Sequence, residues 1–492
     1  MQDLKERTIR GGVARMCAQA ANFLLRVGSL MILARLLSPK DFGLVGMVTA
    51  FTGVLGMFRD FGLSSAAVQR GTVTEQQMST LFWINIVAGG LLGLLIMAMA
   101  PAIAAFYHEP RLFGVTVVLG AGFILNSAGV QHSAILQRQM RFTALAVIGV
   151  ASMIVGTAIA IGGAKAGYGY WALVAMAVAS PLTTTILVWL VTAWIPGMPR
   201  RRAGIRSMMG YGSTLTLYGL IGYVVTNLEK VLLGRYWGAD AIGIYGRAYQ
   251  LANIPTENLN GVVGEVAFPA LSRIQDDSSR LKSYFLKGYS LVLAFTLPIT
   301  IACALFVDDV IYVFLGPKWN AAAVILRLLA PTILVFAICN PLIWLLSSIG
   351  RVGRLLKMNL AIAPLMIASY FVGLPYGPRG VAFAYSAVLT LWVVPAIAWA
   401  VHGTVISFRD MLRTLSRPLA SSIVAGALAF GVRLTYGGSL SPLPKLVLEC
   451  AVLLVTFSAM LLFVTGQKSL YMDLVRGLKR SSSIKEESPV SA

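Results

Sequence analysis

Residues 33–46 read LARLLSPKDFGLVG, and residues 233–246 read LGRYWGADAIGIYG. Leucine, arginine and both glycines recur at an offset of 200 residues, and each copy has an aspartate two or three places before its first glycine. In both copies a long apolar run leads into a short polar turn, and a second apolar run follows. A repeat at a fixed distance along a chain indicates an internal duplication. The duplicated unit is predicted to be a helical hairpin in apolar surroundings.

The composition indicates a membrane protein. Of the 492 residues, 57% are hydrophobic and 12% are charged, whereas soluble proteins carry about 25% charged residues. Apolar runs of roughly 20 residues, the length that crosses a ~30 Å hydrocarbon layer, recur from end to end. The four cysteines lie inside these runs without paired spacing, so we expect no metal or disulfide framework. The net charge of +21 is explained by Lys and Arg in the short loops, which set the orientation of the spans in the membrane. No nucleic acid is therefore expected as a partner.

We therefore predict an all-α polytopic membrane protein with about fourteen transmembrane helices. The predicted spans are residues 12–36, 42–68, 79–106, 112–135, 142–164, 168–195, 208–235, 242–270, 284–307, 321–346, 353–374, 379–401, 416–437 and 443–465. Lys and Arg gather in every second connection, which predicts that both termini are cytoplasmic.

The offset repeat divides these spans into domains. Six spans separate the two copies of the hairpin, so two six-helix lobes are expected, related by a pseudo-two-fold axis along the membrane normal. The predicted division is 1–199 for the first lobe, 200–401 for the second, 402–466 for an additional helix pair and 467–492 for a basic cytoplasmic tail.

The first two spans carry charge at bilayer depth. Such a residue costs at least ~2.5–3.5 kcal/mol on insertion scales, so it usually faces a cavity or a partner. Arg15 and Arg26 are eleven residues apart, which at ~100° per residue places them on one face of a helix. Arg59 and Asp60 are neighbours near the inner end of the second span, and two interpretations stay open: charges at the interface, or a pair that lines a cavity.

The seventh and eighth spans are the other polar ones. Lipid leaves backbone and side-chain polar groups unsatisfied, so these spans are predicted to border water or other helices. Pro255 predicts a kink in the eighth span. Arginine offers forked donors to phosphate, and amides and tyrosines suit sugars, so the lining predicts an anionic, hydroxyl-rich cargo. The polar residues are Asn227, Glu229, Lys230, Arg247, Gln250, Asn253, Glu257, Asn258 and Glu265, with Tyr218, Tyr223, Tyr245 and Tyr249 nearby.

Three further interpretations concern single charges, amphipathic segments and catalysis. Arg327 and Arg433 are interpreted as single charges that reach the interface from span ends. Segments 406–417 and 470–480 are amphipathic and are predicted to rest on the anionic inner leaflet, with a solvated linker as the alternative for the second. No constellation is placed for catalysis, so the chain is interpreted as a transporter without a cofactor.

Two stretches resemble a known family. Residues 33–44, read with Phe61-Gly62-Leu63, and residues 268–277, which read FPALSRIQDD, are similar to polysaccharide transporters of the Wzx type. These are lipid-linked oligosaccharide flippases of the multidrug/oligosaccharidyl-lipid/polysaccharide exporter superfamily. The likeness covers about residues 8–465.

The resemblance implies a flippase for undecaprenyl-pyrophosphate-linked repeat units in exopolysaccharide or lipopolysaccharide biosynthesis. The protein would work by alternating access in a bacterial inner membrane, with membrane lipids, a polymerase and export machinery as partners. The family's cationic cavity would map onto Arg15, Arg26, Arg59 and Lys230. Sugars would meet Asn227, Arg247, Gln250, Asn253 and Asn258. The acid that couples an ion is left open among Asp60, Glu229, Glu257 and Glu265, and no metal site is expected.

Two rival functions fit this sequence less well than a flippase. A cation-coupled multidrug exporter of the same superfamily would favour an acidic cavity, whereas this lining is basic. A membrane-embedded polysaccharide polymerase or ligase would need a sizeable outer loop, and the predicted outer loops are short.

Overall fold

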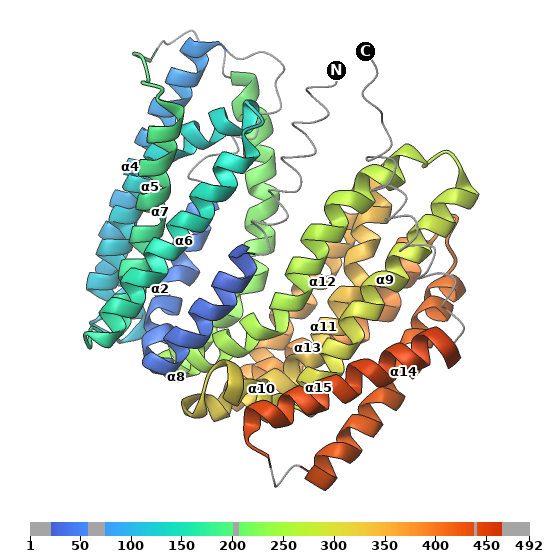
Figure 1. Ribbon diagram of the computed structural model, residues 1–492. Helices are drawn as coiled ribbons and strands as arrows, with labels where there is room; N and C mark the ends of the chain where they lie inside the picture. Colours follow the sequence, from blue (N-terminus) through green and yellow to red (C-terminus); the bar gives the residue numbers. More distant parts are fainter. Residues whose placement is uncertain (1–20, 58–73, 200–205, 437–439, 465–492) are drawn as a thin grey trace, which may run out of the picture. The chain divides into compact units, whose positions relative to one another are not determined.

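The computed structural model describes residues 21–57, 74–199, 206–436 and 440–464. Within helix α8 (Arg206–Arg273), the side chains of residues 206–221, 257–262 and 265–266 are not described. The described secondary structure is helical (Figure 1), which confirms the all-α class. Among the described helices, nine segments are long and apolar enough to cross a membrane. The total of about fourteen spans remains a prediction.

The helices of the first part of the chain follow the predicted spans closely. Residues 21–36 are helical and lead into the repeat. The next helices are α2 (Pro39–Met57), α4 (Glu75–Tyr107), α5 (Leu112–Arg138), α6 (Phe142–Lys165) and α7 (Tyr170–Thr192), followed by α8.

The later helices begin after a short loop. They are α9 (Ser278–Leu305), α10 (Val307–Phe314), the 3₁₀ turn η1 (Pro317–Trp319), α11 (Asn320–Ser348), α12 (Val352–Gly373), η2 (Leu374–Tyr376), α13 (Gly377–Val401), α14 (Phe408–Tyr436), α15 (Pro442–Ala459) and the π-helical turn η3 (Met460–Val464).

Local signals in the sequence set several helix ends. The Thr74 hydroxyl accepts from the Gln77 backbone N–H, and the Gln77 side chain accepts from the Thr74 N–H, so α4 begins with a capping box. Asp277 accepts from the Arg280 and Ser279 N–H groups at the start of α9. These bonds, with the Arg280 contribution largest, lower the pKa of Asp277 because they favour the charged carboxylate.

Helix α8 joins the seventh and eighth predicted spans. Its backbone leaves helical geometry at Gly238, where φ is 81° and ψ is −174°. Glycine adopts this left-handed region without the steric penalty that a Cβ brings. The backbone stays helical through Pro255, so the chain does not break there, and the kink predicted at Pro255 stays a prediction.

The chain divides into two compact units. The first comprises Met1–Gly246 and Phe314–Trp319, and the second comprises Arg247–Val313 and Asn320–Ala492. The seventh predicted span and the second copy of the repeat therefore pack with the first unit. The four-part domain division drawn from the sequence stays a prediction.

Within the first unit, neighbouring helices pack along their lengths. Helix α4 packs on α5, α5 packs on α7, and α6 packs on α7 (Figure 1). Helix α2 contacts both α5 and α7. Small residues permit this close packing: Gly93 and Gly120 each lie against the carbonyl oxygen of the other, between α4 and α5. Close packing of small residues is the usual basis of helix association inside a bilayer.

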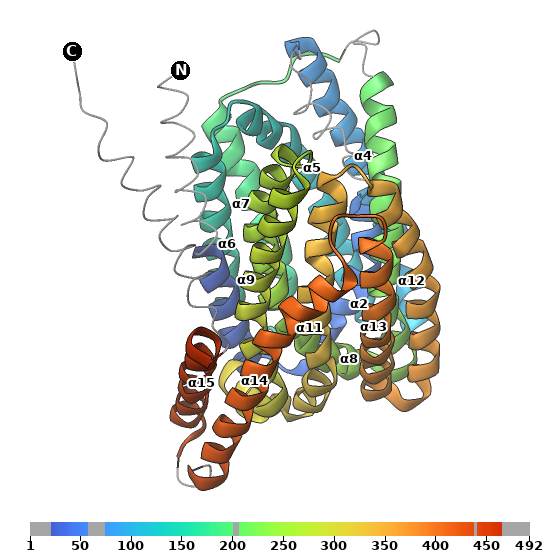
Figure 2. The same ribbon diagram turned by 90° about the vertical axis from the view of Figure 1, so that its right-hand side faces the viewer.

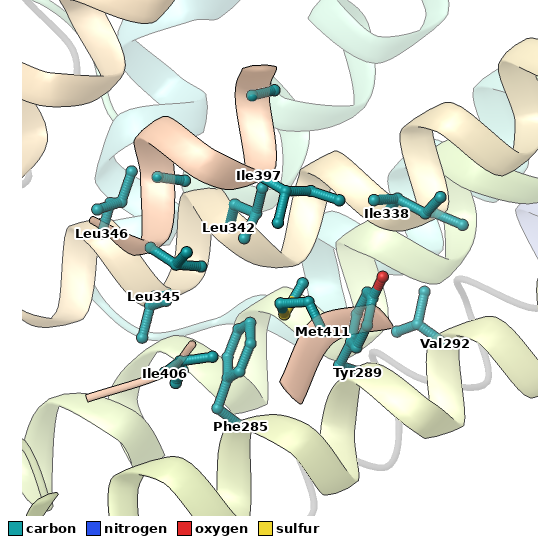
Figure 3. Packing of buried hydrophobic residues seen from close by; sticks show 14 of the residues in the cluster. Phe285, Tyr289, Val292, Ile338, Leu342, Leu345, Leu346, Ile397, Ile406 and Met411 are labelled. Atoms are coloured by element: carbon teal, nitrogen blue, oxygen red, sulfur yellow. The ribbon is translucent and has the colours of Figure 1, made fainter. Parts of the chain in front are cut away.

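Within the second unit, α9, α11, α13 and the start of α14 share one apolar core (Figure 3). Phe285 and Tyr289 of α9 stack with ring centroids 6.1 Å apart, beside Leu342 of α11. Ile406 and Met411 are also buried in this core. Ile406 and Met411 of segment 406–417 therefore pack on protein, whereas Leu412 is exposed, and the prediction that the segment rests on the inner leaflet stays a prediction. Segment 470–480 lies outside the described residues.

The last two helices form a hairpin on the second unit. Helix α14 packs against α15 and against α9 (Figure 2). Their shared core contains Phe306, Ala425, Ala429, Leu446, Leu453, Phe457 and Leu461.

Candidate functional site

The two copies of the repeat contact each other reciprocally in the first unit. Gly43 lies against the carbonyl oxygen of Ala239, and Gly243 lies against the carbonyl oxygen of Pro39. Residues 39 and 239, like residues 43 and 243, are equivalent at the offset of 200. A contact in which each partner offers the same surface is the signature of a two-fold axis. The duplication seen in the sequence is thus a direct packing contact, here called the glycine crossing.

Close backbone approach explains the two glycines of the crossing. A Cβ atom at Gly43 or Gly243 would collide with a backbone carbonyl, and a carbonyl within a helix cannot swing aside as a side chain can. Gly46 is less confined, because its Cβ would lie 3.0 Å from a side-chain methyl of Ile242. Gly246 has no atom of the described residues within 4 Å of its Cβ position. Only part of the repeated motif is therefore required for packing.

The repeated arginines reach from each copy toward the other half of the repeat. Arg235 donates to His108 Nδ1 at 2.9 Å, and its guanidinium lies 5.7 Å from the centroid of the Phe106 ring. The Arg35 side chain lies next to Gly316. His108 and Gly316 both have positive φ, 54° and 96°, and each follows the third span of its half. The arginines thus extend the two-fold relation beyond the glycines.

Trp319 fixes the first copy of the repeat. Its indole N–H donates to the Ala34 carbonyl at 2.8 Å. The ring meets Phe42 edge to face with centroids 5.4 Å apart. Trp319 is fully buried, and its N–H is satisfied as a buried tryptophan requires.

The repeated aspartate has a local role in the first copy. The Ser38 N–H and hydroxyl donate to Asp41 Oδ2 at 2.9 and 2.6 Å. The first of these bonds gives the Ser38 N–H, at the start of α2, an acceptor that the helix backbone does not supply.

The loop between α4 and α5 carries a forked ion pair next to His108. Arg111 donates to Glu109 Oε1 at 2.7 Å and to Oε2 at 2.8 Å. These hydrogen bonds lower the pKa of Glu109, because they favour the ionised carboxylate.

The first half of α8 presents different polar groups on different sides. Tyr223 donates to the Thr49 carbonyl of α2 at 3.2 Å. Glu229 is 1% exposed, and neither carboxylate oxygen has a hydrogen-bond partner from another described residue. Lys230 donates to Asn227 Oδ1 at 2.6 Å. Glu229 therefore points into the protein, and Lys230 is only half-buried.

The predicted cationic cavity is described only in part. Arg26 is exposed on the helix of residues 21–36, and Lys230 is half-buried. Arg15, Arg59 and Asp60 lie outside the described residues. Glu257, Asn258 and Glu265 belong to α8, but their side chains are not described. The roles proposed for all these residues stay predictions.

The polar residues of the second half of α8 belong to the second unit. Arg247 donates to Gln250 Oε1 one turn away, and Asn253 is half-buried one turn further on. Tyr249 lies beside Tyr385 of α13 with centroids 6.1 Å apart. Tyr385 also stacks on Tyr370 of α12 at 5.9 Å.

One tyrosine of the predicted cargo contacts lies next to the glycine crossing. Tyr245 is fully buried in the first unit, and its contact with sugars stays a prediction. Packing next to the glycine crossing buries this side chain, and the sequence pattern did not predict that burial.

The sequence pattern also missed a group of ion pairs at α10, α14 and α15. Arg327 pairs with Asp308 at 2.9 Å, and Arg433 lies 3.5 Å from Asp309. The interpretation of these arginines as single charges is therefore wrong. The signal available in the sequence was the adjacent acids Asp308 and Asp309 between apolar runs, together with Lys445 and Glu449 four residues apart in an apolar span.

Comparison with known proteins places these features in a family. Residues 32–324 match the family model described as polysaccharide biosynthesis protein. The lipopolysaccharide biosynthesis protein WzxC of Escherichia coli K12 is 26% identical over 378 residues, which cover 75% of this chain and 76% of WzxC. The teichuronic acid biosynthesis protein TuaB of Bacillus subtilis is 28% identical over 382 residues, which cover 76% of this chain and 78% of TuaB.

A solved structure shares the fold. The lipid II flippase MurJ in an inward closed conformation superposes with a TM-score of 0.73 at 13% identity, covering 95% of this chain and all of MurJ. The family predicted from residues 33–44 and 268–277 is confirmed. Because the matched segment makes up more than half of the 492 residues, this chain belongs to the polysaccharide biosynthesis protein family.

Proposed function

We propose that this protein is a flippase that moves undecaprenyl-pyrophosphate-linked oligosaccharide repeat units across the bacterial inner membrane. The cargo would serve exopolysaccharide or lipopolysaccharide biosynthesis, and both termini would be cytoplasmic. The observation that carries the proposal is the glycine crossing. A two-fold contact between duplicated halves, in a chain of the polysaccharide biosynthesis family, is what a transporter built from repeats needs.

The crossing gives the proposed cycle a physical basis. Backbone atoms of the two copies meet there through glycines, so the two helices approach closely and the contact is a defined closed state. When the crossing is formed, that end of the first unit is closed. Separation of the two copies would open the same end, and the cargo would leave there.

The proposed cargo contacts follow from chemistry. Pyrophosphate carries negative charge and several acceptor oxygens, which Arg15, Arg26, Arg59 and Lys230 would bind through charge-assisted hydrogen bonds. The hydroxyl groups of the sugars would pair with Asn227, Arg247, Gln250, Asn253 and Asn258. The lipid tail would remain in the bilayer during transfer. A polymerase and the export machinery would act on the product.

Of the four acids proposed for ion coupling, Asp60, Glu229, Glu257 and Glu265, Glu229 is the one whose side chain the structure describes. It is buried and lacks a hydrogen-bond partner from another described residue. A buried ionised carboxylate without partners is costly, so binding of a proton or a cation would stabilise it.

We expect Glu229→Gln to leave the protein folded, because the amide has nearly the same shape and no charge to bury. Export by this variant should no longer change with pH or sodium concentration, whereas wild-type export should change with one of them. Proteoliposomes loaded at different pH and sodium values would measure this. A Glu229→Gln variant with wild-type ion dependence would remove Glu229 from the candidates.

The rival functions are less well supported. The fold is shared across the superfamily, so it does not separate a flippase from a multidrug exporter, whereas the family match and the basic residues favour a polysaccharide precursor. A polymerase or ligase would act after flipping and would place catalytic groups in an extramembrane loop. The connections between the described helices from α9 to α15 are short.

The deciding experiment measures the leaflet distribution of lipid-linked oligosaccharide in spheroplasts depleted of this protein. A glycan-specific probe is applied from outside, and total lipid-linked glycan is assayed after lysis. Accumulation detected only after lysis is the expected result. Accumulation that the probe reaches from outside, without polymer, would mean that flipping is intact and that the protein acts later as a polymerase or ligase.

A further inference from the structure

A group of six charged residues joins α14 and α15 to α10 and α11 in the second unit. It contains three acids, Asp308, Asp309 and Glu449, and three bases, Arg327, Arg433 and Lys445. The group is exposed at one side and closed at the other: the Asp308 side chain is 58% exposed, the Asp309 side chain is 10% exposed and Glu449 is 1% exposed.

The two inner bases both bind Asp309. Lys445 Nζ lies 3.2 Å from Asp309 Oδ1 and 3.0 Å from Oδ2, and Arg433 Nη2 lies 3.5 Å from Oδ2. Arg433 also donates from Nη1 to the Leu305 carbonyl at 2.7 Å and lies 3.8 Å from Asp308. The positive groups of the inner cluster are thus already engaged.

Glu449 is left without such a partner. Lys445 lies one helical turn before it on α15, but the ammonium group points to Asp309 instead. Neither Glu449 carboxylate oxygen has a hydrogen-bond partner among the described residues, although Asp309, Arg433 and Lys445 are close enough to act on it electrostatically. A buried ionised carboxylate in this arrangement is much more costly than a protonated one.

We propose that Glu449 is a proton-binding site of the C-terminal helix pair. In the arrangement described here the Glu449 carboxyl group carries the proton, and Lys445 and Arg433 pair with Asp309. When the proton is lost, Glu449 becomes a carboxylate, and the side chain of Lys445 or Arg433 moves from Asp309 to pair with it. The proton passes to water by way of the exposed side of the group at Asp308, and the change of partner shifts α15 relative to α10.

The charges around Glu449 favour a proton over a metal cation. Arg433 from α14 and Lys445 from α15 already supply positive charge, and Asp309 from α10 is neutralised by them. A metal ion would have to enter next to two cations, and the Asp309 carboxylate already lies within 3.5 Å of both of them. The other titratable groups nearby are Asp308, paired with Arg327 of α11, and the thiols of Cys450 and Cys303.

Infrared difference spectroscopy of the full-length protein in lipid tests the proposal without reference to cargo. The spectrum of Glu449→Gln is subtracted from that of the wild type between about pH 5 and pH 9. We expect the C=O stretch of a protonated carboxyl group at the acidic end, and its loss toward the alkaline end. Asp410→Asn, which breaks a remote ion pair with Lys282, is the matched control and should show no such band.

Asp309→Asn provides an independent variant. It frees Lys445 and Arg433 for Glu449, so the midpoint of the band should move to lower pH by about one unit or more. A band that is absent at every pH, or one that does not change across the range, would overturn the proposal. So would an Asp309→Asn variant with an unchanged midpoint. None of these results bears on whether the protein flips lipid-linked sugars, so the two proposals fail separately.

Discussion

Gly43→Ala is expected to reduce export to about one tenth of the wild-type rate or less, with normal insertion in the membrane. The new methyl group would collide with the Ala239 carbonyl, which belongs to a helix and cannot rotate away. Overpacking of this kind costs about 1–3 kcal/mol, and that cost falls only on the state in which the glycine crossing is formed. Such a bias changes a two-state population by about 5- to 150-fold.

The effect on the crossing can be measured directly. Lys40 and Asp240 are exposed and occupy equivalent places in the two copies. Spin labels at these positions, after replacement of the four native cysteines, should report a longer distance in Gly43→Ala than in the parent. Gly243→Ala should reproduce both effects, because it meets Pro39 in the same way.

Gly246→Ala is the matched control. It changes a glycine of the same motif, but no atom in the described part of the chain lies within 4 Å of the new Cβ atom. Export and the spin-label distance should stay at parental values. If Gly246→Ala lost as much export as Gly43→Ala, the effect of Gly43→Ala would not come from the collision at the glycine crossing.

Arg26→Ala is expected to abolish export while the protein stays folded and inserted. Arg26 precedes the end of its helix at Leu36 by ten residues, about 15 Å, which is near the middle of a ~30 Å hydrocarbon layer. Its side chain is exposed, so removing it leaves no cavity in a core. Each charge-assisted hydrogen bond to pyrophosphate contributes about 1.5–3 kcal/mol, and losing two should lower export by about 100-fold or more.

Two variants make this prediction specific. Arg26→Lys keeps the charge but loses the forked donor, so we expect intermediate export. Lys165→Ala removes an exposed charge at the end of α6 and should export normally. Membrane insertion is checked by the amount of protein in washed membranes, and export by surface polysaccharide. Normal export by Arg26→Ala would contradict the proposed pyrophosphate contact.

Much of the architecture follows from the sequence because the bilayer imposes it. Backbone groups in hydrocarbon must be satisfied within the segment, so an apolar run of about 20 residues has to be a helix. Helices α4, α5, α6 and α7 accordingly match their predicted spans closely. The family followed from short motifs, since residues 33–44 and 268–277 lie within the matched segment.

The sequence also determined that the two hairpins are duplicates, but the tertiary structure decided what the duplication does. The offset of 200 gives the equivalence of Gly43 and Gly243, yet only the packing shows that each meets the other copy's backbone. Similarly, the sequence shows the six charged residues of the group at α10, α11, α14 and α15, but it does not show which of them pair. Apart from Arg327 with Asp308, their pairing depends on contacts between residues more than 100 positions apart, such as Lys445 with Asp309. Periodicity within one helix carries no information about such distant partners, so the buried Glu449 emerged only when those helices were packed together.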